Sequence, residues 1–197
     1  TTSAGRLGVT LVQTNVPQNE KFVPQFLPET LEWLEKTVAS APGPLVVAPE
    51  TAIPLLPEQL GDDGWQRFAA PFRTGNRGLL IGLPLGDYDS GYTNSAAGLS
   101  KDAPQPFYRY DKQHLVPFGE FIPPGFRWFT DMMNIPLGDF ARGPKVPPSF
   151  AFAGQRIGPN ICYEDLFGEE LARRFGDAAS APTILANISN MGWFGDT

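Results

Sequence analysis

Short apolar runs that alternate with helical patterns leave this chain few folds to adopt. The apolar runs are typical of strands and lie at residues 6–14, 45–50, 78–84, 156–161 and 183–189. Apolar side chains recur at helical spacing at residues 27–38, 165–175 and, more weakly, 57–70. Residues 93–99 and 105–111 predict an antiparallel pair of strands. Strands that alternate with helices, with antiparallel hairpins between them, predict an α/β sandwich in which helices cover a mixed sheet.

The composition is that of one globular domain with a substantial core. The chain has 197 residues, of which 42% are hydrophobic. Its net charge of -6 and the absence of clustered Lys and Arg argue against a nucleic-acid partner, so we expect none. A single cysteine rules out an intrachain disulfide. No apolar stretch reaches the roughly 18 residues that cross a bilayer.

Two features of the chain predict that it is a fragment. Three helical patterns against about seven strands would leave sheet surface uncovered. The chain also ends at WFGDT, a few residues past an apolar run. Residues 119–148 contain too many Pro and Gly for regular structure, so we expect an irregular excursion there.

The only cysteine, Cys162, lies where an apolar strand pattern gives way to an acidic helical one, in ICYEDLFGEEL. Such a corner lets a side chain project from the end of a sheet, and the N–H groups of a following helix favour the thiolate over the thiol. A nucleophile is therefore one interpretation of Cys162. The other is a small buried hydrophobe, the usual role of a lone cysteine.

A cysteine nucleophile needs a proton acceptor, and two residues compete for that role. His114 is the only histidine, although nothing near it in the sequence marks it as a base. Glu50 ends the buried run LVVAPE, where partial desolvation raises the pKa of a carboxylate toward neutral pH. Lys112 follows an alternating run and could stabilise an oxyanion there. Read alone, Glu50 is also a plausible loop acid and Lys112 a plausible solvated charge.

Glu50, Lys112 and Cys162 together resemble the Glu–Lys–Cys triad of the nitrilase superfamily, which is built on an αββα sandwich. The motifs that carry the resemblance are VVAPE, YRYDKQHL and NICYED. Within the superfamily, the segments KQHLVPFGEFIP and ISNMGWFGDT resemble the apolipoprotein N-acyltransferases, membrane enzymes that complete bacterial lipoproteins. The resemblance covers nearly the whole chain. It implies that residues 1–197 are one nitrilase-like (CN hydrolase) catalytic domain, without the transmembrane helices that flank it in the family and without the last part of its sandwich.

The resemblance implies a ping-pong acyl transfer. Cys162 would take a fatty acyl chain from a phospholipid as a thioester and pass it to the N-terminal amine of a diacylglyceryl lipoprotein. Glu50 would be the base and Lys112 the oxyanion donor, with no metal or cofactor. Glu120, Tyr163 and Glu164 occupy positions that support the triad in the family, although each is equally plausible as a structural polar residue.

The excursion PPGFRWFTDMMNIPLG carries an apolar cluster suited to a lipid surface or an acyl-chain gate. The residues expected to face lipid are Phe126, Trp128, Phe129, Met132 and Met133 in this cluster, with Trp193 and Phe194 beside the active-site entrance. The alternative is a loop packed on its own core. Many relatives have Asp-Ala before that Trp-Phe pair, whereas this chain has Met191 and Gly192.

The family resemblance also predicts a location, the periplasmic face of the bacterial inner membrane, with the membrane reached through segments outside this chain. Two other functions remain open from the residues. A soluble carbon–nitrogen hydrolase would use the same three residues with water in place of the amine. A catalytically inactive binding module is less favoured, because all three triad positions are filled.

Overall fold

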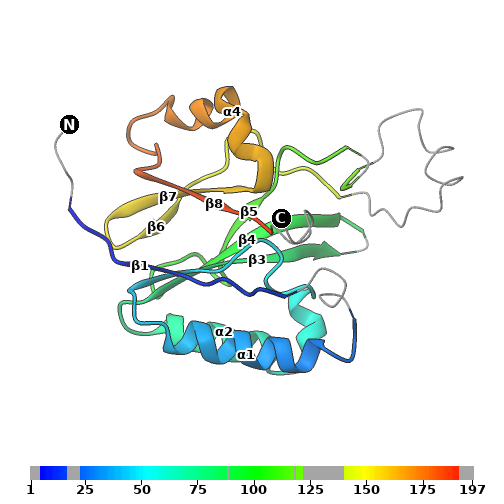
Figure 1. The fold of residues 1–197 in the computed structure, drawn as a ribbon. Coiled ribbons are helices and arrows are strands. Elements are labelled where there is room, and N and C mark those ends of the chain that lie inside the picture. The colour runs from blue at the N-terminus through cyan, green and yellow to red at the C-terminus, as the bar shows by residue number, and fades with distance from the viewer. Residues whose placement is uncertain (1–4, 17–22, 88, 118, 122–139, 191–197) are drawn as a thin grey trace, which may run out of the picture.

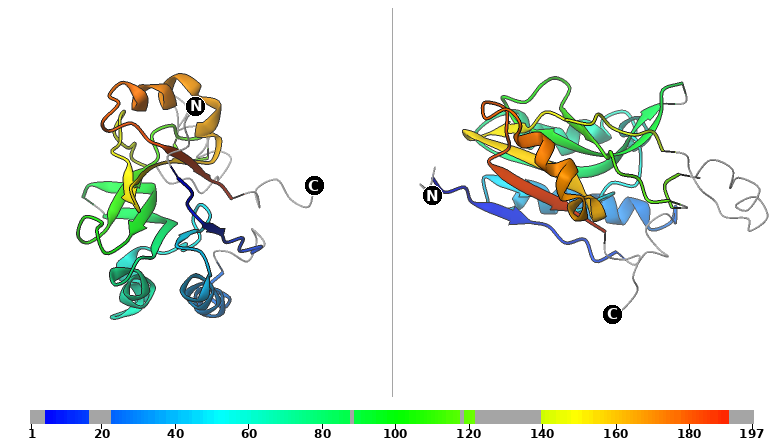
Figure 2. Two further views of the ribbon diagram at one scale, coloured as in Figure 1. Left: turned by 90° about the vertical axis from the view of Figure 1, so that its left-hand side faces the viewer. Right: turned by 90° about the horizontal axis from the view of Figure 1, so that it is seen from above.

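The computed structural model describes residues 5–16, 23–87, 89–117, 119–121 and 140–190. They form four layers, in which two β-sheets face each other and helices cover the outer face of each (Figures 1 and 2). This arrangement is the predicted αββα sandwich.

The larger sheet has the strand order β1-β2-β3-β4-β5. Its first three strands, β1 (Val9–Leu11), β2 (Leu45–Val47) and β3 (Gly78–Asp87), pair in parallel. The next two, β4 (Gly91–Leu99) and β5 (Tyr108–Asp111), continue the sheet as antiparallel hairpins. The predicted pair at 93–99 and 105–111 is therefore confirmed, and β5 runs in the same direction as β2.

The outer face of this sheet is covered by α1 (Leu27–Ser40) and α2 (Gly64–Arg73). Alternate residues of β2, β3 and β4 point toward these helices and form a core with their apolar faces. Its fully buried side chains include Leu34 and Val38 of α1, Phe72 of α2, and Leu79 and Ile81 of β3. The burial of both faces of β2 and β3 explains why these runs are continuously apolar.

The smaller sheet has the order β6-β7-β8, formed by β6 (Phe150–Phe152), β7 (Gln155–Ile161) and β8 (Ile184–Ile188). Its inner face packs on the larger sheet through a second core that includes Leu80, Phe150, Ile157, Ile161 and Ile188. On its outer face lies α4 (Gly168–Ala172) (Figure 2).

Three local predictions differ from the structure. Residues 57–70 do not form one helix, because a 3₁₀ turn at Pro57–Leu60 is followed by Gly61 with φ 81°, before α2 begins. Residues 165–175 form a 3₁₀ helix at Cys162–Leu166, then α4, then a 3₁₀ turn at Arg173–Phe175. Strand β6 was not predicted at all.

Strand β1 carries an apolar face that the smaller sheet does not cover. Val9 pairs with Leu45 and Leu11 with Val47, so Val9 and Leu11 share the face that β2 turns toward the smaller sheet. Val9 is nevertheless 44% exposed and Leu11 77% exposed. Both side chains are therefore exposed at this edge of the sandwich, within the part of the chain that the structure describes.

Candidate active site

Glu50, Lys112 and Cys162 all follow the carboxyl ends of strands. Lys112 comes directly after β5 and Cys162 directly after β7, while Glu50 lies three residues beyond β2. Because β2 and β5 run in the same direction, their carboxyl ends lie at the same end of the larger sheet. The sandwich therefore brings residues that lie far apart in the sequence to one end of the molecule.

Lys112 is buried, with 1% of its surface exposed, and two carboxylates hold its ammonium. Its Nζ lies 3.0 Å from Glu120 Oε2 and 3.1 Å from Glu120 Oε1. The distance to Glu50 Oε1 is 3.5 Å. Burial by itself lowers the pKa of Lys112, but the charges of Glu120 and Glu50 outweigh this effect and hold the pKa above its ordinary value. Lys112 is therefore a cation at neutral pH.

Asn94 in β4 joins the two carboxylates, and the sequence carried no sign of this role. Its Nδ2 donates hydrogen bonds to Glu50 Oε1 at 2.8 Å and to Glu120 Oε1 at 2.6 Å. The second oxygen of each acid accepts a hydrogen bond from a backbone N–H group. Asn190 N donates to Glu50 Oε2 at 3.0 Å, and Val116 N donates to Glu120 Oε2 at 2.9 Å. The result is a buried network of two acids, one lysine and one amide.

Cys162 occupies a sharp corner between β7 and the 3₁₀ helix. Its φ of 58° is in the left-handed region, which is uncommon for a residue with a Cβ. The side-chain amide of Asn187 donates to the Cys162 carbonyl at 2.7 Å and to Asn160 Oδ1 at 2.5 Å, and so ties the corner to β8. The expectation of a regular helix directly after the thiol was wrong, because this turn is a 3₁₀ helix that ends at Leu166.

The thiol lies close enough to the ammonium for the two to interact electrostatically. A negative charge on Cys162 is among the causes that raise the pKa of Lys112, after the effects of Glu120 and Glu50. The Cys162 side chain is partly buried against the core between the sheets. A thiol near a protonated lysine that also contacts two carboxylates can support nucleophilic attack with proton transfer.

Tyr163 and Glu164, the two residues after the thiol, make structural contacts. Tyr163 Oη donates to the Leu115 carbonyl at 2.7 Å, and the Lys112 ammonium lies 5.6 Å from the centre of the Tyr163 ring. Burial and, secondarily, the charge of Glu120 raise the pKa of Tyr163 to about 12, so its hydroxyl is neutral.

Glu164 is buried and accepts four hydrogen bonds. Its Oε1 accepts from the backbone N–H groups of Gln113 at 2.7 Å and His114 at 3.0 Å. Its Oε2 accepts from Tyr110 Oη at 2.6 Å and Ile161 N at 2.7 Å. Glu164 thus connects the backbone beside Lys112 to the backbone beside Cys162, which favours the structural alternative for this residue.

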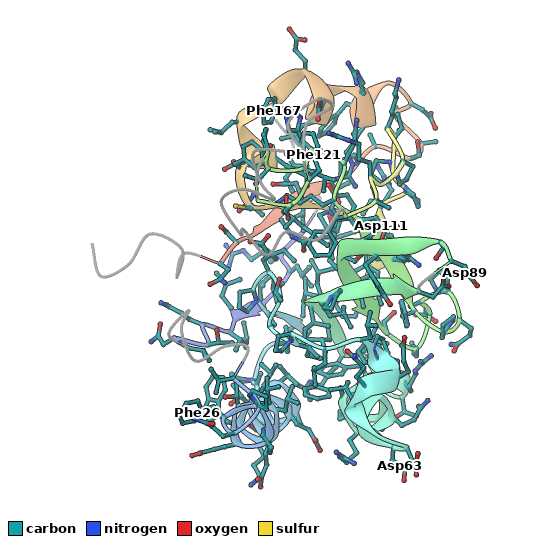
Figure 3. The ribbon with its side chains drawn as sticks, turned by 90° about the vertical axis from the view of Figure 1, so that its right-hand side faces the viewer. Phe26, Asp63, Asp89, Asp111, Phe121 and Phe167 are labelled. Carbon is teal, nitrogen blue, oxygen red and sulfur yellow. The ribbon has the colours of Figure 1, made fainter. Side chains whose placement is uncertain are left out.

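His114 makes its side-chain contacts elsewhere. Its Nδ1 lies 3.2 Å from Glu170, and its ring stacks on Phe167 with 3.6 Å between the ring centres. Phe167 lies on the α4 side of the molecule with Phe121, away from Phe26 and Asp63 beside α1 and α2 (Figure 3). Within the described ranges no hydrogen bond joins His114 to Cys162, so the geometry does not support a Cys–His pair.

Two glycines let the backbone approach the acids and the lysine closely. A Cβ on Gly82 of β3 would lie 2.5 Å from Pro49 O and 2.7 Å from Glu50 Cα. A Cβ on Gly143 would overlap the Asp111 carbonyl, and Gly143 N donates to Lys112 O at 2.9 Å. Only glycine fits either position without moving the chain that carries Glu50 or Lys112.

The residues predicted to face lipid lie outside the described ranges. They are Phe126, Trp128, Phe129, Met132, Met133, Trp193 and Phe194, and their role stays a prediction. Among the described residues, no group of three or more His, Cys, Asp or Glu side chains could hold a metal ion. None of the helices in the described ranges is both long and apolar enough to cross a membrane.

Comparison with known proteins identifies close relatives for the sequence. No protein-family model matches the chain. An apolipoprotein N-acyltransferase from Verminephrobacter eiseniae is 54% identical over 192 residues, which are 97% of this chain and 36% of the relative. Another, from Ralstonia nicotianae, is 48% identical over 96% of this chain and 36% of its own length. The chain thus spans little more than a third of these relatives.

Solved structures with the same fold are more distant in sequence. A CN-hydrolase superfamily protein from Xanthomonas campestris superposes with a TM-score of 0.62 at 17% identity, over 93% of this chain and 64% of that one. An amidase from Nesterenkonia sp. gives the same TM-score, identity and coverage. The chain is therefore homologous to one segment of the apolipoprotein N-acyltransferases and has the fold of the nitrilase, or CN-hydrolase, superfamily.

Proposed function

We propose that this chain is the catalytic segment of an apolipoprotein N-acyltransferase, in which Cys162 carries a fatty acyl group as a thioester. The buried Lys112, held by Glu50 and Glu120 beside Cys162, is the observation that carries the proposal. The identity of 54% to one such enzyme over 97% of the chain supports the choice of reaction.

In the first half-reaction, the Cys162 sulfur attacks the carbonyl carbon of a phospholipid acyl ester while Glu50 takes the thiol proton. Lys112 donates a hydrogen bond to the oxyanion of the tetrahedral intermediate. The ester C–O bond then breaks, and the proton held by Glu50 passes to the departing lysophospholipid oxygen. An acyl thioester on Cys162 remains.

In the second half-reaction, the N-terminal α-amine of a diacylglyceryl lipoprotein attacks the thioester carbon. Glu50 accepts a proton from the amine, the C–S bond breaks, and the proton returns to the sulfur. The products are an amide and the free Cys162 thiol. Two carboxylates near the lysine suit this cycle, because Glu50 must alternate between its charged and neutral forms while Glu120 keeps Lys112 protonated.

A lipid substrate implies work at a membrane surface. We place the segment at the periplasmic face of the bacterial inner membrane, reached through parts of the protein beyond residues 1–197. The aromatic and methionine side chains between Phe126 and Met133, with Trp193 and Phe194, would contact acyl chains. The relatives' name is consistent with a lipoprotein acceptor.

An acyl-enzyme assay tests the reaction. The full natural polypeptide that contains this chain would be incubated in detergent with a phospholipid and no lipoprotein, and its intact mass measured. We expect an acyl adduct on Cys162 that neutral hydroxylamine removes and that the Cys162→Ala variant lacks. A diacylated lipopeptide with a free N-terminus should then discharge the adduct, whereas the same lipopeptide N-acetylated should not.

Variants of the competing bases sharpen the result. Glu50→Gln should abolish the adduct, and His114→Ala should leave it nearly intact. The opposite pattern would support the hypothesis that His114 is the base for Cys162. If no adduct forms with phospholipid while small amides are hydrolysed, the protein is a carbon–nitrogen hydrolase and the proposal is wrong.

A further inference from the structure

Arg174 is a buried cation that the proposed mechanism does not use. It lies in the 3₁₀ turn that follows α4, and only 5% of its surface is exposed. Its Nη1 donates a hydrogen bond to the Pro159 carbonyl of β7 at 2.5 Å. Its Nε and Nη2 are buried and have no hydrogen-bond partner in the described part of the chain. Buried polar groups are normally paired, so these two nitrogens require an explanation.

The aromatic neighbours of the guanidinium do not supply the missing acceptors. The centre of the Tyr110 ring lies 5.7 Å from Arg174 Cζ, and a ring face stabilises the charge without pairing the N–H bonds. Burial raises the pKa of Tyr108, while the neighbouring Arg174 acts in the opposite direction. The Tyr108 hydroxyl already donates to Pro148 O at 2.7 Å. It is a single oxygen, so a bond to it would still leave one of the two nitrogens without an acceptor.

Arg174 lines a small pocket between α4, the end of β5 and the segment before β6. The empty space there is about 280 Å³, part of it open to solvent. Pockets for drug-sized ligands are larger, roughly 300–1,000 Å³, so this one suits a compact ligand. Lys145 is exposed and lines the pocket from the segment before β6. A ligand would therefore meet one buried and one exposed cation.

Two acids also line the pocket, and both have partners of their own. Glu164 accepts the four hydrogen bonds described above. Glu170 lies 3.2 Å from His114 Nδ1. Neither acid forms an ion pair with Arg174 within the described ranges, so the guanidinium charge stays available to a ligand. The acids oppose a bound anion, and we therefore expect its affinity to be modest.

The positions of the two unpaired nitrogens indicate the shape of the ligand. Nε and Nη2 form one side of the planar guanidinium, and their N–H bonds are nearly parallel. Two oxygens on one carbon or phosphorus atom match such a pair, which is how arginine binds carboxylates and phosphates. A water molecule offers one oxygen and matches the pair less well.

We propose that the pocket beside Arg174 binds a small oxyanion, a phosphate or carboxylate group, which pairs with Nε and Nη2 and is attracted by Lys145. The inference goes beyond the proposed function and does not depend on it, because neither cation belongs to the group formed by Glu50, Lys112 and Cys162. The same oxygens are offered by a free anion and by the phosphodiester of a lipid head group.

Thermal unfolding of the full natural polypeptide in detergent tests the site. The probes are sodium phosphate, sodium acetate and glycerophosphoethanolamine, each added at constant ionic strength with sodium chloride as the reference. We expect phosphate or acetate to raise the unfolding temperature in a saturable way, because a ligand that binds only the folded state stabilises it. A rise with glycerophosphoethanolamine as well would identify a lipid head group as a possible source of the anion.

Four variants separate the pocket from general effects of salt. Arg174→Lys keeps the charge but loses the paired donors, so the same rise should require roughly tenfold more phosphate. Lys145→Gln changes an exposed residue and should weaken the response severalfold. The control Arg173→Gln removes the same charge from the next residue, which is exposed, and should keep the response. Cys162→Ala should also keep it, because the pocket is separate from the thiol.

A response to phosphate that is equal in the unchanged protein, Arg174→Lys and Lys145→Gln would overturn the inference, since salt would then act on the whole surface. The inference also fails if none of the three probes raises the unfolding temperature more than sodium chloride does. If Arg174→Lys does not fold, the comparison of Lys145→Gln with Arg173→Gln decides the question.

Discussion

The side-chain amide of Asn187 in β8 holds the backbone carbonyl of Cys162 with a 2.7 Å hydrogen bond. The two residues are 25 positions apart, yet this bond supports the left-handed backbone that turns the thiol out of β7. The corner is therefore stabilised by a side chain from the neighbouring strand as well as by its own turn.

Replacing Asn187 with Ala should release the corner. We expect alkylation of Cys162 to slow at least severalfold, and the free energy of unfolding to fall by about 1–2 kcal/mol, because the Cys162 carbonyl and the buried Asn160 lose their donor. Thr183→Ala, a polar truncation just before the same strand, is the control and should leave the alkylation rate unchanged. If Asn187→Ala leaves the alkylation rate of Cys162 unchanged, the backbone turn at Cys162 does not depend on the hydrogen bond from Asn187.

Gly82→Ala should displace Glu50. The added Cβ would lie 2.5 Å from Pro49 O and 2.6 Å from Thr51 N, so the segment that carries Glu50 must move. We expect acylation to be nearly lost, with a stability loss of about 1–3 kcal/mol typical of overpacking. In the control Gly168→Ala the new Cβ has no neighbour within 4 Å, so both the acylation and the stability of the protein should be retained. Equal behaviour of the two variants in the acylation assay would contradict the prediction.

Glu164→Gln should destabilise the protein although the change is nearly isosteric. Each carboxylate oxygen accepts two donors, so an amide NH₂ in either place faces at least one buried N–H. We expect a loss of about 1–3 kcal/mol in urea unfolding. Tyr110→Phe removes one of the four donors and leaves the Glu164 carboxylate with three hydrogen bonds, so it should lower the free energy of unfolding by about 1 kcal/mol. A Tyr110→Phe loss larger than that of Glu164→Gln would argue against this account.

The stabilising contribution of Lys112 should depend on pH in a defined direction. Its folded pKa is raised above the ordinary 10.5, so the contribution is complete below pH 10.5 and is lost as pH rises through the folded pKa. Lys112→Met should cost about 3–5 kcal/mol at pH 7, because two buried acids lose their counter-ion. The difference in unfolding free energy between the two proteins should shrink above pH 10.5. The control Lys36→Met removes an exposed ion pair with Glu32 and should change the free energy of unfolding little. If the difference in unfolding free energy between the unchanged protein and Lys112→Met grows above pH 10.5, the prediction is wrong.

The alternation of strands and helices could be predicted because the two have distinct apolar periods, whereas the second sheet was expected only from the family resemblance. The runs at β2 and β3 are apolar on both faces, and α1 carries a clear helical stripe, so their places in the sandwich follow from the pattern. Strand β6 could not be predicted in this way. It is three residues long, and its hairpin to β7 turns at Ala153 and Gly154, both with positive φ, where Ala is an unusual choice.

Parts of the candidate site were also predictable, and others were not. The strand-like runs before Glu50, Lys112 and Cys162 made these residues candidates, but read alone Glu50 and Lys112 were equally plausible as a loop acid and a solvated charge. The family resemblance selected these three positions and Glu120. Asn94 and Asn187 carry no such signal, since an asparagine inside a strand predicts nothing by itself. The partners of Asn94 lie 44 and 26 positions away, and the backbone N–H that Glu50 accepts comes from 140 positions away.

The apolar pattern by itself determined an α/β fold with helices that cover a sheet, because burial imposes a local period on apolar side chains. The four-layer αββα arrangement was expected only from the resemblance to the nitrilase superfamily. Only the tertiary structure decided which polar groups meet at the ends of the strands. Parallel alignment of β2 and β5 places Glu50 and Lys112 together, and it lets one amide from β4 reach both acids. Hydrogen bonds and ion pairs act over a few ångströms in space, so their partners are set by strand pairing and not by distance along the chain.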